Sequence, residues 1–136
     1  MVFTRPDEAR RFAEATGVDV LAPAVGNMHG LLAAMVRGQA RKHLDIGRIA
    51  QIKAATGMPL TLHGGSGTDD DDFRRAIEAG MTIVHISTEL RLAWRRGLEV
   101  ALAAEPDNLV PYQLFRKSSE GIRDVVANRL KLFNRH

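Results

Sequence analysis

Three histidines, His29, His63 and His85, each stand at or just beyond the end of a short apolar run. A neutral imidazole is a common zinc ligand, and its second ring nitrogen is then left for a hydrogen bond. The chain has no cysteine, so a metal would have to be held by His, Asp, Glu or backbone oxygen. His29 and His63 are therefore candidate metal ligands. Either one is also compatible with a purely structural, hydrogen-bonding role.

Glycines and hydroxyl side chains accompany the histidines. Gly64, Gly65, Ser66 and Gly67 follow His63 and precede a predicted helix. Unobstructed backbone N–H groups just before a helix bind phosphate, but a tight strand-to-helix turn needs glycine as well. Residues 87–88, a serine and a threonine, start the next predicted helix, where they bind phosphate or simply cap the helix. Both readings remain open for both segments.

The elements that must position these residues alternate between helix and strand. Apolar runs typical of strands buried on both faces of a parallel sheet cover 18–25, 59–62 and 81–86. Helical spacing of apolar residues predicts helices over 5–15, 45–56, 69–79, 88–104 and 119–133, with a connector over 106–117. The acidic run 69–72 reads as a helix start rather than a calcium or magnesium loop, and His43 and His136 have no partner pattern.

Strict alternation of apolar strands with helices predicts an α/β fold with a parallel sheet and helices outside it. A TIM (β/α)8 barrel needs eight such units and about 250 residues, and its function gathers at the C-terminal ends of the strands. The 136 residues hold about three βα units plus flanking helices. The chain is therefore predicted to be part of a TIM barrel, with the histidines at its functional end.

Composition narrows the function classes. The chain is 45% hydrophobic and 26% charged with a formal net charge of +3, as in ordinary globular domains. Its basic residues are scattered and only 5% of residues are aromatic, which argues against nucleic-acid binding and suits a small anionic substrate. No apolar run is long enough to span a membrane and no signal-peptide pattern is visible, so a cytoplasmic location is expected.

Several segments resemble the class II, zinc-dependent fructose-bisphosphate and tagatose-bisphosphate aldolases. The most specific is Leu-His-Gly-Gly-Ser-Gly at 62–67. The similarity also includes residues 4–9, 16–22, 29–30, 69–80, 88–90, 93–94 and the tail over 116–133. It extends over nearly the whole chain and places it in the C-terminal half of the barrel, so residues 1–136 are predicted to be a partial aldolase barrel.

The resemblance implies a reaction and a site. Family members cleave a ketose 1,6-bisphosphate into dihydroxyacetone phosphate and an aldehyde phosphate, using a zinc ion held by three histidines to polarise the ketone. His29 and His63 match two of these ligands. The positions that match the substrate site are Gly30, Gly64, Gly65 and Ser66 around dihydroxyacetone phosphate, and Ser87 and Thr88 at its phosphate.

Two departures from the family pattern bear on activity. The third zinc histidine and the proton-transferring aspartate of the family lie in the N-terminal half, which this chain lacks on this reading, so no catalytic residue is assigned within it. His85 stands where the family usually has an asparagine that contacts substrate, and it can still hydrogen-bond a substrate hydroxyl. His85 or Glu89 is the candidate to replace the missing acid/base if the chain acts alone. Residues 31–33 replace the family's aromatic and lysine, which leaves the exact sugar open.

The predicted function is that of a zinc-dependent aldolase, with fructose 1,6-bisphosphate as the expected substrate and zinc as the cofactor. The isolated chain is expected to be a poor aldolase, because it lacks a third ligand and a general acid/base. A homo-oligomer or a partner chain would then supply the missing half. The alternative is a non-catalytic half-barrel, or a fragment from a truncated gene, that retains phosphate- and metal-binding residues.

Overall fold

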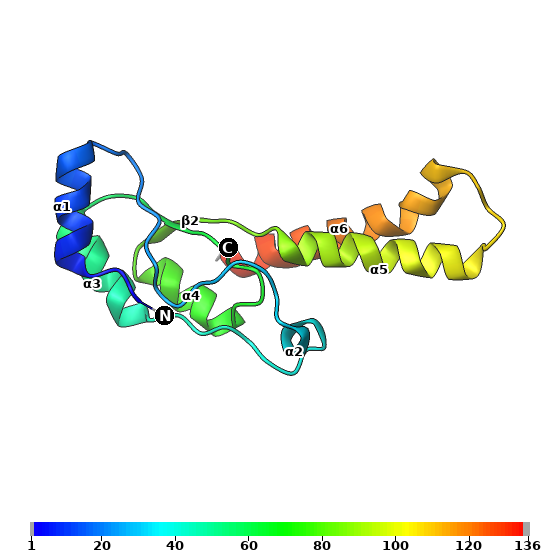
Figure 1. Ribbon diagram of the computed structural model, residues 1–136, viewed down its shortest axis with the longest axis horizontal. Helices are drawn as coiled ribbons and strands as arrows, with labels where there is room; N and C mark the ends of the chain where they lie inside the picture. The colour runs from blue at the N-terminus through cyan, green and yellow to red at the C-terminus, as the bar shows by residue number, and fades with distance from the viewer. Residues whose placement is uncertain (1, 135–136) are drawn as a thin grey trace. The chain divides into compact units, whose positions relative to one another are not determined.

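The computed structural model describes residues 2–134, and within them the chain forms six helices and two strands (Figure 1). Their order is α1 (Pro6–Thr16), α2 (Ala33–Val36), α3 (Ile46–Thr56), β1 (Leu60–Leu62), α4 (Asp70–Glu78), β2 (Met81–Val84), α5 (Thr88–Ala104) and α6 (Pro111–Phe133). The elements group into two compact units, Met1–Ile86 and Ser87–His136. Each unit is described by itself below.

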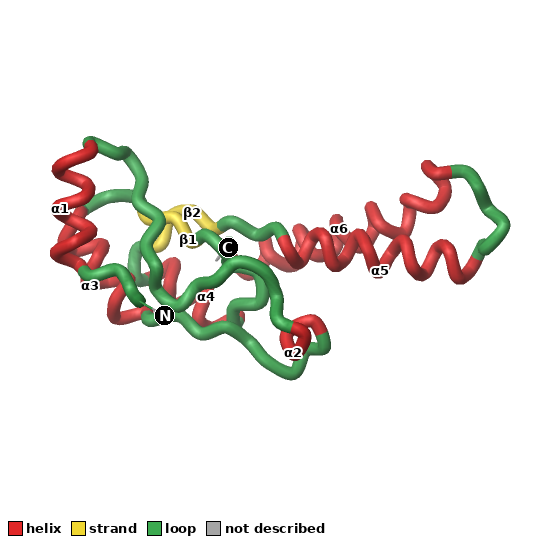
Figure 2. Tube along the Cα trace, in the orientation of Figure 1, coloured by secondary structure: helices red, strands yellow, loops and turns green. Residues whose placement is uncertain are grey.

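The sheet of the first unit contains β1 and β2, which pair in parallel with Leu60 opposite Met81 (Figure 2). The run 18–25 adds only an isolated parallel bridge between Leu21 and Leu60. The prediction of a regular strand there is wrong, because only Leu21 bonds to the β1 segment and the backbone of residues 24–25 bonds outside the sheet. The N–H of Ala24 donates to the hydroxyl of Thr4, and residue 23 is a proline, which has no N–H to donate.

The predicted helices are confirmed to within about two residues, except at the start of α6. The expected connector over 106–117 is too long, because α6 already begins at Pro111. Proline fits the first turn of a helix, where its missing N–H has no intrahelical partner in any case. The acidic run does start a helix: the Asp69 carboxylate accepts hydrogen bonds from the backbone N–H groups of Asp71 and Asp72.

The core of the first unit joins segments that are distant in the sequence. Ile49 and Ile52 of α3, Leu60 and Leu62 of β1, and Phe73 of α4 are all fully buried. These side chains form the buried core of the unit, in which α3 contacts α1 and α4, and α4 contacts β2.

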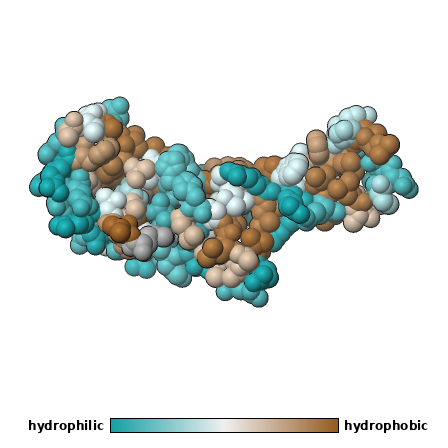
Figure 3. All heavy atoms as spheres, in the orientation of Figure 1, coloured by the Kyte–Doolittle hydropathy of each residue, from teal (hydrophilic) through white to brown (hydrophobic). Residues whose placement is uncertain are grey.

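The second unit is a hairpin of α5 and α6. Gly97 lets the helices approach closely, since a Cβ there would lie 2.5 Å from the backbone of Ser118. The buried Ser118 hydroxyl donates to the carbonyl of Trp94 at 2.8 Å. Several large apolar side chains of this hairpin are exposed, and Figure 3 shows apolar atoms gathered over its surface. Among the described residues, no helix is both long and apolar enough to cross a membrane.

Candidate functional site

The three histidines that follow apolar runs lie together in the first unit. The ring centroids of His29 and His63 are 5.9 Å apart, and those of His63 and His85 are 4.5 Å apart in an edge-to-face arrangement. All three residues are exposed. The loop after Leu21 provides the first of them, and the segments after β1 and β2 provide the other two. The segments after β1 and β2 and the loop after Leu21 therefore bring together the three histidines that the sequence pattern had marked.

His63 and His85 also contact each other through their ring nitrogens. Their Nδ1 atoms are 3.4 Å apart, so one ring can donate a hydrogen bond and the other accept it, depending on the tautomers. When His63 donates from Nδ1, its Nε2 carries the lone pair that a metal requires. His85 can therefore orient His63, a role that differs from the substrate contact expected from the sequence.

The glycines after His63 are required by close packing of the backbone. Gly64 has φ +64°, and a Cβ there would lie 2.6 Å from the carbonyl oxygen of Met28. The N–H of Gly65 donates to the carbonyl of His85 at 3.3 Å, and a Cβ there would lie 3.1 Å from the same oxygen. Tight packing thus explains these two glycines, and the Gly65 N–H already has a protein acceptor.

The other predicted substrate residues of the first unit differ in accessibility. Ser66 is buried within its loop, so its hydroxyl is enclosed by protein. Gly30 has φ +81°, and the space where its Cβ would be is open. Gly30 therefore leaves unobstructed backbone next to His29, as close approach of a ligand requires.

Ser87 and Thr88 begin the second unit. Ser87 occupies the N-cap position of α5 but makes no side-chain capping hydrogen bond. Its hydroxyl instead accepts from Arg91, whose Nε and Nη2 lie at 3.2 and 3.0 Å. The simple capping interpretation is therefore wrong for Ser87. Glu89, the other candidate acid/base, accepts two hydrogen bonds from Arg129 at 2.9 and 3.0 Å.

Sequence reasoning missed two polar contacts around the histidine loops. Asn27 accepts from the N–H of Val25 and donates from Nδ2 to the carbonyl of His63, both at 2.8 Å. His43, which had no partner in the sequence pattern, lies 3.0 Å from Asp72 through Nδ1. The position of Asn27 two residues before His29 was a usable signal. A pairing between positions 43 and 72 is not visible in sequence spacing.

The donor set fits a shared metal only in part. Two imidazoles that bind one zinc at about 2.0–2.1 Å have ring centroids roughly 5–6 Å apart, and the rings of His29 and His63 satisfy this at 5.9 Å. Within residues 2–134, however, no group of three or more His, Asp or Glu side chains is placed to hold a metal ion. The described residues thus offer a pair of histidines and not a complete ligand set.

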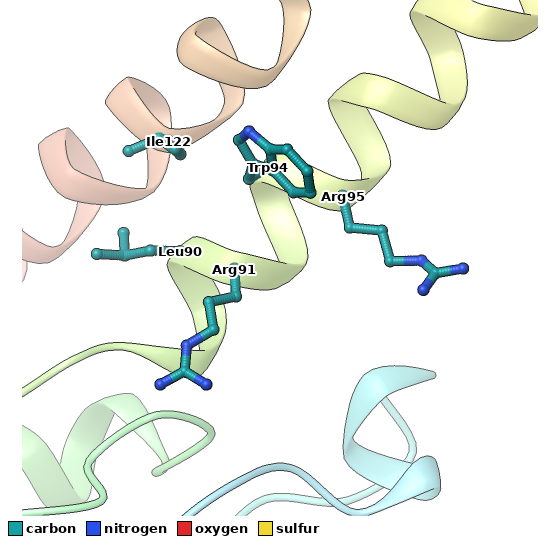
Figure 4. A pocket seen from close by; sticks show the side chains of 5 residues that line it. All are labelled: Leu90, Arg91, Trp94, Arg95 and Ile122. Atoms are coloured by element: carbon teal, nitrogen blue, oxygen red, sulfur yellow. The ribbon is translucent and has the colours of Figure 1, made fainter. Parts of the chain in front are cut away.

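A separate hollow of about 480 Å³ lies on the hairpin of the second unit. Figure 4 shows Leu90 and Trp94 on α5 with Ile122 on α6, while Arg91 and Arg95 extend from α5 away from Ile122. Its lining includes no residue of the predicted substrate or metal site.

Comparison with known proteins identifies relatives of the whole chain. A family model described as fructose-bisphosphate aldolase class II matches residues 1–136. The YdjI aldolase of Escherichia coli K12 is 32% identical with a TM-score of 0.77, and the match covers 97% of this chain and 46% of that one. A candidate fructose-1,6-biphosphate aldolase of Coccidioides immitis is 28% identical with a TM-score of 0.73, covering 97% and 43% of the two chains.

A third similar structure supports the fold alone. It is the fructose-bisphosphate aldolase Fba of Campylobacter jejuni, at 17% identity and a TM-score of 0.76, over 97% of this chain and 45% of that one. The chain thus spans a little under half the length of the solved structures it matches. The prediction of an α/β fold that forms part of a TIM barrel is confirmed.

Proposed function

Because this chain belongs to the class II fructose-bisphosphate aldolase family, we propose that it forms part of a zinc-dependent aldolase that cleaves fructose 1,6-bisphosphate. The observation that carries the proposal is the meeting of His29 and His63, which come from separate loops, at a ring separation suited to one metal. The carbon–carbon lyase reaction, its substrate and the metal are all proposed for this chain from its family.

In this proposal His29 and His63 hold the zinc, which when bound supplies Lewis-acid polarisation of the substrate ketone. With His63 as the donor in the contact between the two Nδ1 atoms, His85 orients the ring and leaves the Nε2 of His63 for the metal. It also faces solvent, where it can hydrogen-bond a substrate hydroxyl. Gly30 leaves its backbone open to the dihydroxyacetone phosphate portion of the substrate.

The phosphate contacts are the least direct part of the proposal. Ser87 and Thr88 begin α5, and backbone N–H groups at a helix N-terminus favour anions. The N-terminus of α4 is already capped by the Asp69 carboxylate, so the turn 64–67 contributes its own backbone and not a helix N-terminus. The contact between Arg91 and Ser87 adds a positive charge at the start of α5. We assign Gly64, Gly65 and Ser66 to the dihydroxyacetone phosphate site, and Ser87 and Thr88 to its phosphate.

A third zinc ligand and a proton-transferring group have to be supplied in addition. The side chain of Glu89 is held by Arg129, which makes Glu89 a poor acid/base. We therefore expect residues outside 1–136, in a longer form of this protein or in a partner of different sequence, to complete the site. Loss of general acid/base catalysis costs about 10²- to 10⁴-fold in rate, so the chain alone should be nearly inactive.

The test combines zinc binding with aldol cleavage by the full 136-residue chain. Zinc affinity is measured by calorimetry for the unsubstituted chain, for His29→Ala and His63→Ala, and for His43→Ala as a matched control. The control removes an exposed histidine that is paired with Asp72 and lies outside the ligand pair. Cleavage of fructose 1,6-bisphosphate is measured with and without a chelator.

The two readouts separate the parts of the proposal. Zinc uptake that is lost in both ligand variants and kept in His43→Ala supports the metal site. Equal zinc uptake in all four proteins, or none in any, refutes it. Chelator-sensitive cleavage by the chain alone would refute the requirement for residues outside 1–136, whereas zinc binding without turnover supports that requirement.

A further inference from the structure

A buried lysine side chain ends among three backbone carbonyls next to the histidine pair. Lys42 is only 4% exposed. Its Nζ lies 2.5 Å from the carbonyl oxygen of Met28, 2.7 Å from that of Gly30 and 3.2 Å from that of Gly64. An ammonium group has three N–H donors, so these three acceptors match its hydrogen-bonding capacity.

The three carbonyls belong to the two loops that carry the candidate ligands. Met28 and Gly30 flank His29 on both sides, and Gly64 directly follows His63. The single Nζ atom therefore bridges the His29 loop and the His63 loop. Asn27 adds a second link between the same loops through its bond to the carbonyl of His63.

The backbone of Lys42 is itself anchored to the glycine-rich turn. Its N–H donates to the carbonyl of Gly67 at 2.8 Å, and its carbonyl accepts from the N–H of Asp69 at 3.0 Å. Residues 42 and 68 form an isolated parallel bridge in the same region. The ammonium is thus held at a defined position relative to the turn, and it can transmit that position to the loop around His29.

A buried charge is tolerated only when it is well hydrogen-bonded, because its desolvation costs several kcal/mol. Here the charge also has a specific effect on its surroundings. Without it, three carbonyl dipoles would point at one another across a shared space. The ammonium is therefore what permits the two loops to lie this close together.

Lys42 is not placed to act as a nucleophile. Covalent catalysis by lysine requires an unprotonated amine with access to the substrate. The nitrogen here is buried and donates to three backbone carbonyls, so it is not open to a substrate. Its contacts suit a fixed cation.

We propose that Lys42 is a positioning residue whose ammonium sets the separation of the His29 and His63 loops and thereby the geometry of the metal-binding pair. The expected effect on zinc affinity rests on the proposed function. The bridge between the loops rests on the observed contacts alone.

The test compares Lys42→Met with Lys53→Met in the full chain. Lys53 is a matched control, because its Nζ also donates to backbone carbonyls, those of Gly57 and Met58, but at the end of α3. Both substitutions keep the aliphatic stem and remove the ammonium. Thermal unfolding is measured for each, so that loss of fold is detected separately from loss of geometry.

We expect Lys42→Met to lose about 10- to 100-fold in zinc affinity, the usual effect of removing a group that orients a metal ligand. Lys53→Met should keep the affinity of the unsubstituted chain. Added ammonium chloride should restore part of the loss in Lys42→Met, whereas tetramethylammonium chloride at the same ionic strength should not, because it has no N–H donor. Unchanged zinc affinity in Lys42→Met, or equal losses in both variants, would overturn the proposal.

Two NMR measurements keep the test independent of zinc and of the variant's stability. In the unsubstituted chain, a Lys42 ammonium bound to three carbonyls should give a slowly exchanging N–H signal, and its absence would overturn the proposed bridge even if Lys42→Met fails to fold. The second measurement is the ring-to-ring Overhauser effect between His29 and His63. If the chain binds no zinc, the proposed aldolase function fails. A weaker Overhauser effect between His29 and His63 in Lys42→Met would still support the positioning role, and an unchanged Overhauser effect would refute it.

Discussion

Replacing Gly64 by alanine should separate the two histidine loops. Gly64 has φ +64°, and the new Cβ would lie 2.6 Å from the carbonyl oxygen and 2.7 Å from the carbonyl carbon of Met28. Both atoms are backbone, so no side-chain rotation relieves the contact. The Cβ must retreat by roughly 0.5–1 Å to reach ordinary non-bonded distance, and the loop around His29 has to move with it.

Gly57→Ala supplies the matched control. Gly57 has φ +66°, almost the same φ as Gly64, but no atom outside its neighbours lies within 4 Å of the position of its Cβ. Alanine at either position adopts the left-handed conformation at a cost of about 1–2 kcal/mol. Only Gly64→Ala adds a backbone clash, and overpacking of this kind costs about 1–3 kcal/mol of folding stability. We therefore expect a loss in unfolding free energy of about 1–2 kcal/mol for Gly57→Ala and roughly 2–5 kcal/mol for Gly64→Ala.

The assay must report on the first unit. The single tryptophan, Trp94, lies on α5 in the second unit, so its fluorescence reports on that unit. Urea unfolding monitored by the methyl signals of Ile49 and Ile52 reports on the first unit, because both side chains are fully buried in its core. Zinc affinity is measured on the same samples. Equal destabilisation by the two substitutions, with zinc affinity unchanged in both, would refute the reasoning that Gly64 exists for close approach of the loops.

Three further outcomes are expected. Asp72→Asn should destabilise the first unit by about 1–3 kcal/mol in urea unfolding. The Asp72 carboxylate is only 7% exposed and accepts a hydrogen bond from the buried N–H of Leu44, which an asparagine replaces imperfectly. The control Asp71→Asn should change the stability little, because Asp71 is exposed. Gly97→Ala should lower the unfolding midpoint followed by the fluorescence of the single tryptophan, since its Cβ would lie 2.5 Å from the backbone of α6; an unchanged midpoint would contradict the packing of the hairpin. The hydrogen bond from Lys117 lowers the pKa of Glu120. The contribution of this hydrogen bond to folding stability is therefore complete above the ordinary glutamate range and is lost as the pH falls through the lowered pKa. NMR titration of Lys117→Met should find the pKa of Glu120 raised toward its ordinary value.

Local patterns in the sequence were sufficient for most of the helices. Glycines at positions 17 and 57 end α1 and α3 in the left-handed conformation, and Asp69 caps α4. These are interactions between residues a few positions apart, which spacing and residue type specify. The apolar run 18–25 failed as a strand prediction because strand formation depends on a partner for each backbone group. The N–H of Ala24 found its partner in Thr4, a contact that no periodicity records.

The same distinction between local and distant contacts applies to the candidate site. Sequence alone marked His29, His63 and His85 and the nearby glycines as candidates, because a histidine follows an apolar run in each of three short segments. Only the tertiary structure decided that His63 contacts His85, and that the ammonium of Lys42 reaches carbonyls in two separate loops. Such contacts join positions 12 to 22 residues apart in the chain. Their geometry depends on how the buried side chains of α3, β1 and α4 pack together, which spacing along the chain does not encode.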